Sequence, residues 1–454
     1  MGKATKTKTL WECSECGHRQ PKWVGSCPIC KNWNTFSEEV VFEQKFSAPQ
    51  NKPIPISEVA LLQEQRIQTK IIEFDRLLGG GVAIGSLALV GGSPGIGKST
   101  LMLQVASSFA KQGLAVLYIC GEESAEQTKM RAERLQIYDK NLYLFNETSL
   151  SPIKNEIQNL KPDVVIVDSI QILYKPEIPS SPGSILQVKE IALEFMHLAK
   201  GFSITIFLIG HVTKSGEIAG PRVLEHIVDT VLDFEGERVH GFRLLRSSKN
   251  RFGSTDDIAI FQMDEKGLKE VPNPSVAFLE ERMRGGPGSV IVAALEGTRP
   301  FLIEIQALVS PTSYPTPTRR AIGFDNNRLS LLIAVLEKRV GYHLYNFDLF
   351  VSIAGGMRFL EPALDLGVIL AIASSFSNRS IDPETLLVGE VGLGGEVRGV
   401  SRIEARLKEG IQMGFKKAVI SKRNLKGLPT FFSEKLDIVV VSVVEEAIQA
   451  LLPR

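Results

Sequence analysis

The sequence predicts an α/β protein in which a parallel-sheet core is preceded by a small metal-binding module and followed by an α+β domain. Three observations support this prediction. Two Cys-x-x-Cys pairs lie within the first 30 residues, a glycine-rich loop follows an apolar run near residue 90, and strand-like runs alternate with helical ones from 57 to 270. We expect a metal module at 1–37, a linker at 38–56, the core at 57–270 and the last domain at 271–454.

The composition is that of an ordinary globular protein. Of the 454 residues, 44% are hydrophobic and 23% are charged. Because 52 Lys and Arg residues nearly balance 51 Asp and Glu residues, any basic surface must be local. The chain has no apolar run of about 18 residues and no apolar segment typical of a secretory signal. We therefore expect a cytoplasmic protein that has no membrane partner.

The first element is a compact module that contains four of the five cysteines. Cys13, Cys16, Cys27 and Cys30 form two Cys-x-x-Cys knuckles, and each knuckle can present two thiolates to one tetrahedral Zn²⁺. A redox dithiol is the alternative, but redox motifs seldom occur as a doubled pair. The pattern favours a structural zinc ribbon. We expect the three tryptophans of the chain, Trp11, Trp23 and Trp33, to form its small core, although an exposed one could instead stack on a base.

The second element is a phosphate-binding loop. "GGSPGIGKST", residues 91–100, follows the apolar run "SLALV" and precedes a helical pattern, which is the context that such a loop requires. Lys98 would place its charge at the β and γ phosphates of ATP, Ser99 would ligate Mg²⁺, and the N–H groups at the helix start favour anions. The residues expected to contact the nucleotide are Gly92, Ser93, Pro94, Gly95, Ile96, Gly97, Lys98, Ser99 and Thr100.

Acidic side chains follow two other strands of the core. Asp168 ends "DVVIVD", where a carboxylate can orient hydrated Mg²⁺, although a helix cap is the alternative. Glu122 and Glu123 follow "AVLYICG" directly before a helical pattern. One of them can polarise the attacking water, but acids in a first helical turn are favourable in any case. We choose Glu122 as the general base and keep Glu123 in reserve.

A third strand, "SITIFLIG", is followed by His211, which could sense the γ phosphate or could simply be a satisfied hydrogen-bonding residue. The loop after it, "VTKSGEIAGPR", contains Gly216 and Gly220, which make it flexible, and Lys214 and Arg222, which make it basic. A flexible basic loop that leaves the sheet beside a nucleotide could be ordered by nucleotide state and could contact DNA phosphates.

Further cations lie in two other loops. Lys249 and Arg251 stand in "KNRFG" between two strand-like runs, where a solvated hairpin tip is the alternative interpretation. Arg319 and Arg320 lie in the Pro-rich stretch "PTSYPTPTRRAIGFDNNRL", and Arg328 follows closely. Because Arg clusters suit phosphate contacts, these three arginines are candidate DNA contacts, with a solvated surface loop as the alternative.

The order of these motifs resembles the bacterial RadA (Sms) family of recombination and repair ATPases over essentially the whole chain. "KNRFG" is similar to the signature motif of that family, and the central segment resembles the RecA/DnaB-type ATPase core. Since nucleotide lies between ring subunits in such ATPases, the resemblance implies that Lys249 and Arg251 reach a neighbour's phosphates. Arg251 would then stabilise charge in the transition state.

The last domain resembles the Lon protease domain but departs from it at the catalytic positions. In "FLEPALDLG", Ala363 stands where the family has its nucleophilic Ser, and in "GEVRGVSRIEARLKEG" we align Glu404 with the catalytic Lys. Ala has no nucleophilic atom, and Glu cannot act as an amine base. Proteolysis is therefore not expected.

Together these features predict a DNA-dependent ATPase of homologous recombination and repair. The resemblance implies a homo-oligomeric ring, expected to be a hexamer, that binds single-stranded and branched DNA and works with a recombinase of the RecA type. We expect it to process or migrate branched intermediates. The alternative is an ATP-gated scaffold that loads or stabilises the recombinase without translocating.

Overall fold

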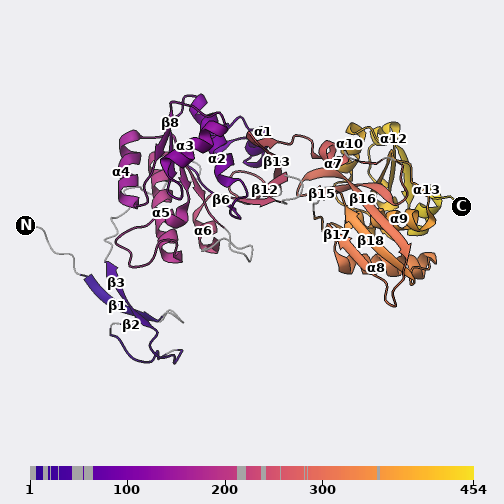
Figure 1. Cartoon of the computed structure of the whole chain (residues 1–454), viewed down its shortest axis with the longest axis horizontal. Coiled ribbons are helices and arrows are strands. Elements are labelled where there is room, and N and C mark those ends of the chain that lie inside the picture. The colour runs from indigo at the N-terminus through magenta and orange to yellow at the C-terminus, as the bar shows by residue number, and fades with distance from the viewer. Residues whose placement is uncertain are drawn as a thin grey trace, which may run out of the picture. The chain divides into compact units, whose positions relative to one another are not determined.

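The computed structural model describes residues 7–13, 19–20, 22–28, 30–42, 55, 65–211, 221–236, 242–255, 257–280, 282–283, 285–354 and 358–453. The chain separates into two compact units, Met1–Gln63 and Glu64–Arg454 (Figure 1). The boundary expected near residue 270 lies inside the second unit and stays a prediction.

The first unit is a small antiparallel ribbon. Strand β1 (Thr7–Cys13) pairs with β3 (Phe36–Phe42) and β2 (Arg19–Gln20). Cys13 and Cys27 are buried and form its centre together with Trp11, which packs against them. The expectation that all three tryptophans form the core is wrong, because Trp23 and Trp33 are exposed. Sulfur ligands rather than indole rings fill the interior of a module this small.

The core of the second unit is a mixed sheet with the strand order β14-β13-β12-β11-β6-β10-β9-β7-β8. The six neighbouring strands β11, β6, β10, β9, β7 and β8 pair in parallel, as predicted. Strands β12, β13 and β14 extend the sheet from β11 in antiparallel pairs. The strands are β6 (Leu87–Gly92), β7 (Val116–Cys120), β8 (Leu142–Phe145), β9 (Val164–Asp168), β10 (Thr205–Ile209), β11 (Thr230–Gly236), β12 (Phe242–Asn250), β13 (Ile258–Asp264) and β14 (Gly267–Glu270). A separate pair is formed by β4 (Arg66–Ile67) and β5 (Val82–Ala83).

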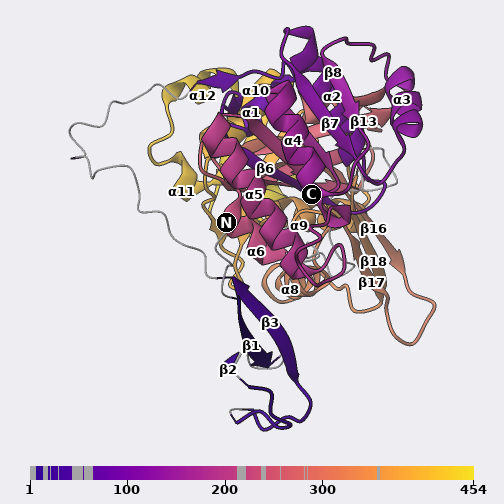
Figure 2. The same ribbon diagram turned by 90° about the vertical axis from the view of Figure 1, so that its left-hand side faces the viewer.

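Helices cover both faces of this sheet because its strands are apolar on both sides. Helices α1 (Ile72–Leu77) and α2 (Lys98–Lys111) pack on one face, whereas α4 (Leu150–Leu160), α5 (Ile185–Phe202) and α6 (Pro221–Ile227) pack on the other (Figures 1 and 2). Helix α3 (Ala125–Arg134) begins after β7 with a capping box between Ser124 and Gln127, and η2 (Ile170–Ile172) follows β9.

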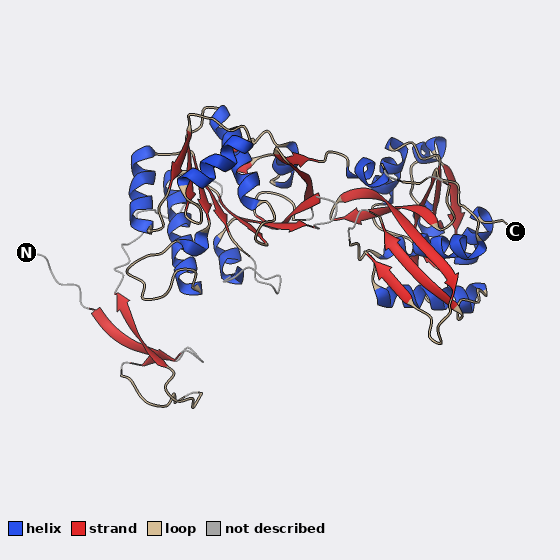
Figure 3. Cartoon of the chain, in the orientation of Figure 1, coloured by secondary structure: helices blue, strands red, loops and turns tan. Residues whose placement is uncertain are grey.

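The C-terminal part is an α+β fold, as predicted, around a second mixed sheet with the order β17-β18-β16-β15-β19-β22-β23 (Figure 3). Its strands are β15 (Ser289–Glu296), β16 (Arg299–Pro311), β17 (Arg319–Ile322), β18 (Phe347–Ile353), β19 (Thr385–Val388), β22 (Lys417–Ser421) and β23 (Asp437–Val441), with β20 (Glu390–Val391) and β21 (Val397–Arg398) as a small hairpin. One face packs against α8 (Asn326–Val335), α9 (Asp365–Ser377) and α13 (Val444–Leu451).

The opposite face packs against α10 (Ile403–Gln412) and α12 (Thr430–Lys435). Helix α7 (Pro274–Leu279) contributes Phe278 to the first of these cores and Leu279 to the second. The remaining short elements are η3 (Leu336–Val340), η4 (Pro362–Leu364) and α11 (Lys422–Leu425). In the described part of the chain, no helix is both long enough and apolar enough to cross a membrane.

The antiparallel extension of the first sheet shares a core with the C-terminal part. Ile258 and Ile260 of β13 are buried in the same apolar cluster as the strands of the second sheet. The rings of Phe242 and Phe278 meet edge to face with centroids 5.4 Å apart. The β12–β13 extension therefore belongs as much to the C-terminal core as to the first sheet.

Candidate nucleotide-binding site

The phosphate-binding loop connects the end of β6 to the start of α2, as the sequence predicts. Gly97 precedes α2 with φ at 119°, and a Cβ atom there would lie 2.8 Å from Cε of Met263. Only glycine fits this position without strain. The conformation leaves the first N–H groups of α2 without helical acceptors, and such an end attracts anions.

Lys98 occupies the centre of the loop. Its ammonium group donates to the carbonyl oxygens of Gly92 at 2.8 Å and Ser93 at 3.0 Å. Burial lowers the pKa of Lys98 to about 8, even though the carboxylates of Asp168 and Glu122 act in the opposite direction. The side chain is thus buried inside the loop, and a bound phosphate would favour its charged form.

His211 links Lys98 to Glu122. Its Nδ1 lies 3.2 Å from Nζ of Lys98, and its Nε2 lies 2.7 Å from Oε1 of Glu122. Because Lys98 can only donate, we assign Nδ1 as the acceptor and Nε2–H as the donor to Glu122. Ser169 also donates to the same Glu122 oxygen. The hydrogen bond from His211 lowers the pKa of Glu122, which keeps that carboxylate ionised.

Glu123 is engaged elsewhere. Its carboxylate forms an ion pair with Arg131 of α3 and takes no part in the contacts that join Lys98, His211 and Glu122. The adjacent acids therefore differ in their surroundings. This difference supports the choice of Glu122 as the candidate base.

Asp168 lies at the carboxyl end of β9, where its Oδ2 accepts a hydrogen bond of 2.7 Å from the hydroxyl of Tyr118. In the parallel register Asp168 is opposite Cys120 of β7 and Ile209 of β10. Glu122 and His211 come two residues after those strands end. The predicted acids and His211 thus converge with the phosphate-binding loop at one edge of the sheet, where open α/β sheets bind ligands.

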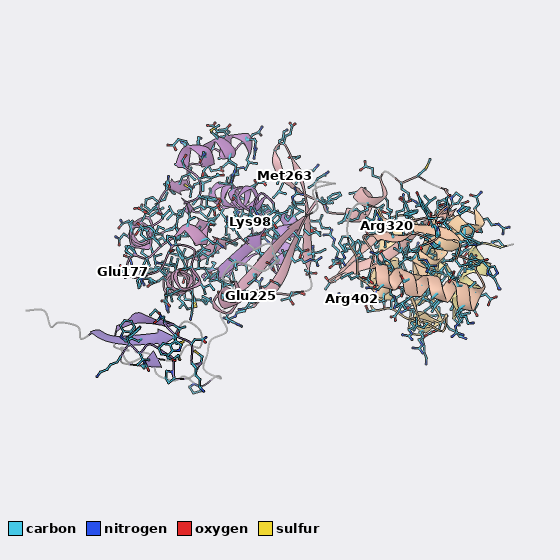
Figure 4. The ribbon with its side chains drawn as sticks, turned by 60° about the horizontal axis from the view of Figure 1, so that its bottom comes forward. Lys98, Glu177, Glu225, Met263, Arg320 and Arg402 are labelled. Atoms are coloured by element: carbon cyan, nitrogen blue, oxygen red, sulfur yellow. The ribbon has the colours of Figure 1, made fainter. Side chains whose placement is uncertain are left out.

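A cavity of about 1040 Å³ opens at this edge. Its lining includes Lys98, Ser99, Thr100 and the candidate base, together with residues that the sequence interpretation missed (Figure 4 labels Lys98 and Met263). The missed residues are Arg131, Arg134, Gln136, Met263, Asp264, Glu265 and Lys266. The last four are the end of β13 and the turn that leads to β14. A turn signal is visible in "MDEKG", but its position beside the loop depends on the pairing of distant strands.

Lys249 and Arg251 lie at the opposite edge of the same sheet. Lys249 donates to the carbonyl oxygens of Glu225 and Val228, the latter at 2.8 Å, and thereby satisfies the C-terminal end of α6 in its own subunit. Arg251 is 57% exposed at its side chain and reaches Oδ1 of Asp229 at 3.4 Å. The implied role across a subunit interface therefore fits Arg251 better than Lys249.

The first unit contains a candidate metal centre. The sulfur atoms of Cys13, Cys27 and Cys30 all lie within 4.8 Å of one another, and those of Cys13 and Cys30 are 3.6 Å apart. Two thiolates at about 2.3 Å from one tetrahedral zinc ion would be about 3.8 Å apart. These residues fit zinc, while Cys16 lies outside the described residues.

The candidate DNA contacts differ in their surroundings. Arg319 and Arg320 are exposed on the edge strand β17. Arg328 instead pairs with the buried Asp365 and donates to the carbonyl oxygen of Val391 at 3.0 Å, which speaks against a phosphate contact. Two further candidates come from the loop after His211. Lys214 lies outside the described residues, and Arg222 belongs to α6.

The segment that resembles the protease nucleophile region contains a buried ion pair. Ala363 is buried in η4, directly after Glu361 and Pro362. From α10, Arg406 reaches this segment and pairs with Glu361, whereas the sequence alignment places Glu404 at the catalytic lysine. The pair is structural in character because Arg406 is fully buried and its guanidinium is held by Glu361 and by backbone carbonyl oxygens.

The fold and this site define a P-loop ATPase with an N-terminal zinc-ribbon module. Comparison with known families agrees. The family described as "AAA domain" matches residues 53–217, and the family described as "Rubredoxin metal binding domain" matches residues 11–38. The chain belongs to the family of DNA repair protein RadA, as the relatives below show.

The curated protein named DNA repair protein RadA from Chlamydia trachomatis serovar D is 51% identical over 98% of this chain and 99% of the relative. The one from Bacillus subtilis strain 168 is also 51% identical, with the same coverage. Among solved structures, a KaiC-like protein from Pyrococcus horikoshii covers 46% of this chain and 99% of its own chain, at 19% identity and a TM-score of 0.39.

Proposed function

We propose that the chain is a DNA-dependent ATPase that works as a homo-oligomeric ring. In this ring, Arg251 of a neighbouring subunit completes each nucleotide-binding site. Lys98 holds the β and γ phosphates, Ser99 and Asp168 hold Mg²⁺, and Glu122 accepts the proton of the attacking water. His211 orients Glu122 through the hydrogen bond of 2.7 Å. When bound, Mg²⁺ would neutralise charge on the phosphates.

The observation that carries this proposal is the distance between Arg251 and its own loop. Asp229, which contacts Arg251, accepts from the N–H of Leu87 at the first residue of β6. The phosphate-binding loop follows Gly92 at the last residue of that strand. At about 3.3 Å per residue, β6 alone separates the two by about 17 Å. Arg251 therefore cannot reach its own nucleotide, but it can serve a neighbour.

The test is a mixing experiment. Arg251→Ala should keep nucleotide affinity near normal and lose most of the hydrolysis, since the missing charge acts mainly in the transition state. Lys98→Ala should be inactive because it lacks the phosphate-binding cation, yet it still offers an intact Arg251. Mixing the two inactive variants should restore part of the activity at shared interfaces. Lys269→Ala, which removes an exposed cation of β14, is the control and should hydrolyse ATP normally.

A second mixture combines Arg251→Ala with the wild-type chain. If the two inactive variants do not complement each other, and if Arg251→Ala lowers wild-type activity only in proportion to dilution, Arg251 acts within its own subunit. Light scattering should give the molar mass of an oligomer, which we expect to be a hexamer. Failure of the wild-type chain to assemble would also overturn the proposal.

We further propose that the ring binds single-stranded and branched DNA, processes branched recombination intermediates and acts with a recombinase of the RecA type. The exposed Arg319 and Arg320 support the DNA contact, because neither side chain has a partner among the described residues and both are available to phosphates. ATPase assays with and without single-stranded DNA, run beside a strand-unwinding assay, test this. Stimulation without unwinding would favour an ATP-gated scaffold that loads or stabilises the recombinase.

A further inference from the structure

One end of the C-terminal sheet has a face that no helix of the described residues covers. On β16, Leu302 is buried under α10 and α12, but Gln306 and Leu308 on the same face are exposed. In the register of the sheet, Leu308 is opposite Phe350 of β18, and Phe350 is opposite Arg320 of β17. A cavity of about 520 Å³ lies over this face, and its lining includes Arg320, which Figure 4 labels. We name it the Glu304 pocket.

The inner end of the pocket holds a buried acid. Glu304 is 3% exposed and accepts hydrogen bonds from the hydroxyl of Ser289 and from the amide of Gln306, the latter at 3.1 Å. Within the described part of the chain, no cation lies at ion-pair distance from it. A carboxylate accepts about four hydrogen bonds, so about two acceptor positions remain. A buried carboxylate with neutral partners alone is costly, and a ligand with N–H donors would offset that cost.

The outer end of the pocket is apolar and then cationic. Leu308 is 61% exposed and Phe350 is 38% exposed, so both present a flat apolar surface to the cavity. Along β16, Glu304 and Leu308 are separated by about 13 Å, and each neighbouring strand adds about 5 Å. The pocket therefore runs from an acceptor of hydrogen bonds, across an apolar surface, to the guanidinium of Arg320.

We propose that the Glu304 pocket binds a guanine base of single-stranded DNA, an inference that rests on the proposed DNA binding. The Watson–Crick edge of guanine has two adjacent donors, N1–H and the 2-amino group, and a carboxylate can accept from both. The base would pack on Phe350 and Leu308, and its phosphate would reach Arg320. Arg320 at the rim disfavours the other ligand with paired N–H donors, an arginine side chain of a protein partner.

The first test needs no variant. Fluorescence anisotropy with the full chain should show that dT12 carrying one central deoxyguanosine binds roughly tenfold more tightly than plain dT12. Deoxyinosine, which lacks the 2-amino group, should lose most of that gain, whereas 7-deazadeoxyguanosine, which keeps the Watson–Crick edge, should retain it. Equal affinity for all four oligonucleotides would overturn the inference alone. If none of them binds, the proposed DNA binding fails as well.

The second test assigns the preference to the pocket. Glu304→Gln should abolish the guanine preference and leave affinity for dT12 unchanged, with folding checked by thermal unfolding. Glu384→Gln, a change in an exposed carboxylate paired with Lys416, is the matched control and should keep the preference. In a competition assay, the phosphate-binding loop is first saturated with a non-hydrolysable ATP analogue. Under these conditions dGMP and N-acetyl-arginine amide should compete only weakly with the oligonucleotide that contains deoxyguanosine. Strong competition by dGMP would assign the pocket to a free nucleotide, and strong competition by the arginine amide to a protein partner.

Discussion

The buried pair of Arg406 and Glu361 allows a stability prediction that can be worked from its contacts. Arg406 is fully buried and donates to Glu361, to the carbonyl oxygen of Ser401 at 3.0 Å and to that of Ala293. Glu361 in turn accepts from the backbone N–H of Leu295 at 2.6 Å. Arg406→Met keeps most of the side-chain volume, but it leaves a carboxylate that is only 20% exposed and two carbonyl oxygens without this donor.

Removing one partner of a buried ion pair typically costs about 3–5 kcal/mol, because the other charge stays buried. For a domain of 150–250 residues, about 2–4 °C in Tm corresponds to each kcal/mol, so we expect Tm to fall by about 6–20 °C. Differential scanning calorimetry of the full chain measures this. Hydrogen exchange of β15 should also become faster, because β15 carries Ala293 and Leu295.

The control is Arg398→Met, which removes an exposed arginine paired with Glu390 and Glu396 in the same part of the chain. Surface pairs contribute little, so its Tm should stay close to that of the wild type. A second comparison uses Glu361→Leu combined with Arg406→Met. Removal of both charges should be less destabilising than Arg406→Met alone. The reasoning would be refuted if Arg406→Met and Arg398→Met lowered Tm equally. It would also be refuted if the double variant had a lower Tm than Arg406→Met alone.

Three further predictions concern the other sites. Lys98→Ala should weaken ATP binding, whereas Glu122→Gln should bind ATP and hydrolyse it slowly; equal loss of binding in titration calorimetry would contradict this division. Cys27→Ser should lose zinc and the folded ribbon together, measured by metal analysis and circular dichroism, and a wild-type chain purified without zinc would remove the basis of the prediction. Replacing Arg319 and Arg320 with Ala should reduce the salt dependence of single-stranded DNA binding by about 0.7 slope units per lost contact, and an unchanged slope would exclude them from the interface.

The sequence was sufficient to predict those parts of the candidate nucleotide site whose position depends only on the order of the strands. Asp168, Glu122 and His211 each follow a buried parallel strand, so their meeting at one edge of the sheet could be expected from the motif order. On the sequence alone Glu122 is chosen over Glu123, but the physical reason for the distinction is visible only in the structure. It depends on Arg131, which draws Glu123 to α3.

Contacts between distant segments account for the remaining differences. Arg328 lies in an Arg-rich loop in sequence, but its partner Asp365 is 37 residues away and is buried. Arg406 lies 45 residues from Glu361, and only the fold, which packs both α10 and η4 against β15, identifies it as the residue beside this segment. Lys249 is one of two cations in a turn, and only the position of α6 shows that it acts as a helix cap.

The apolar cluster shared by β13 and the second sheet limits how the protein can be divided. A chain shortened to end near residue 270 would keep Ile258 and Ile260 but would lose the strands that bury them. It would also lose Arg299, which contacts Glu73, and Glu296, which contacts Arg246. Such a fragment would expose an aggregation-prone apolar surface beside the hairpin that borders the phosphate-binding loop. Its failure to hydrolyse ATP would then reflect misfolding or aggregation, and it would reveal nothing about the contribution of the missing half to catalysis.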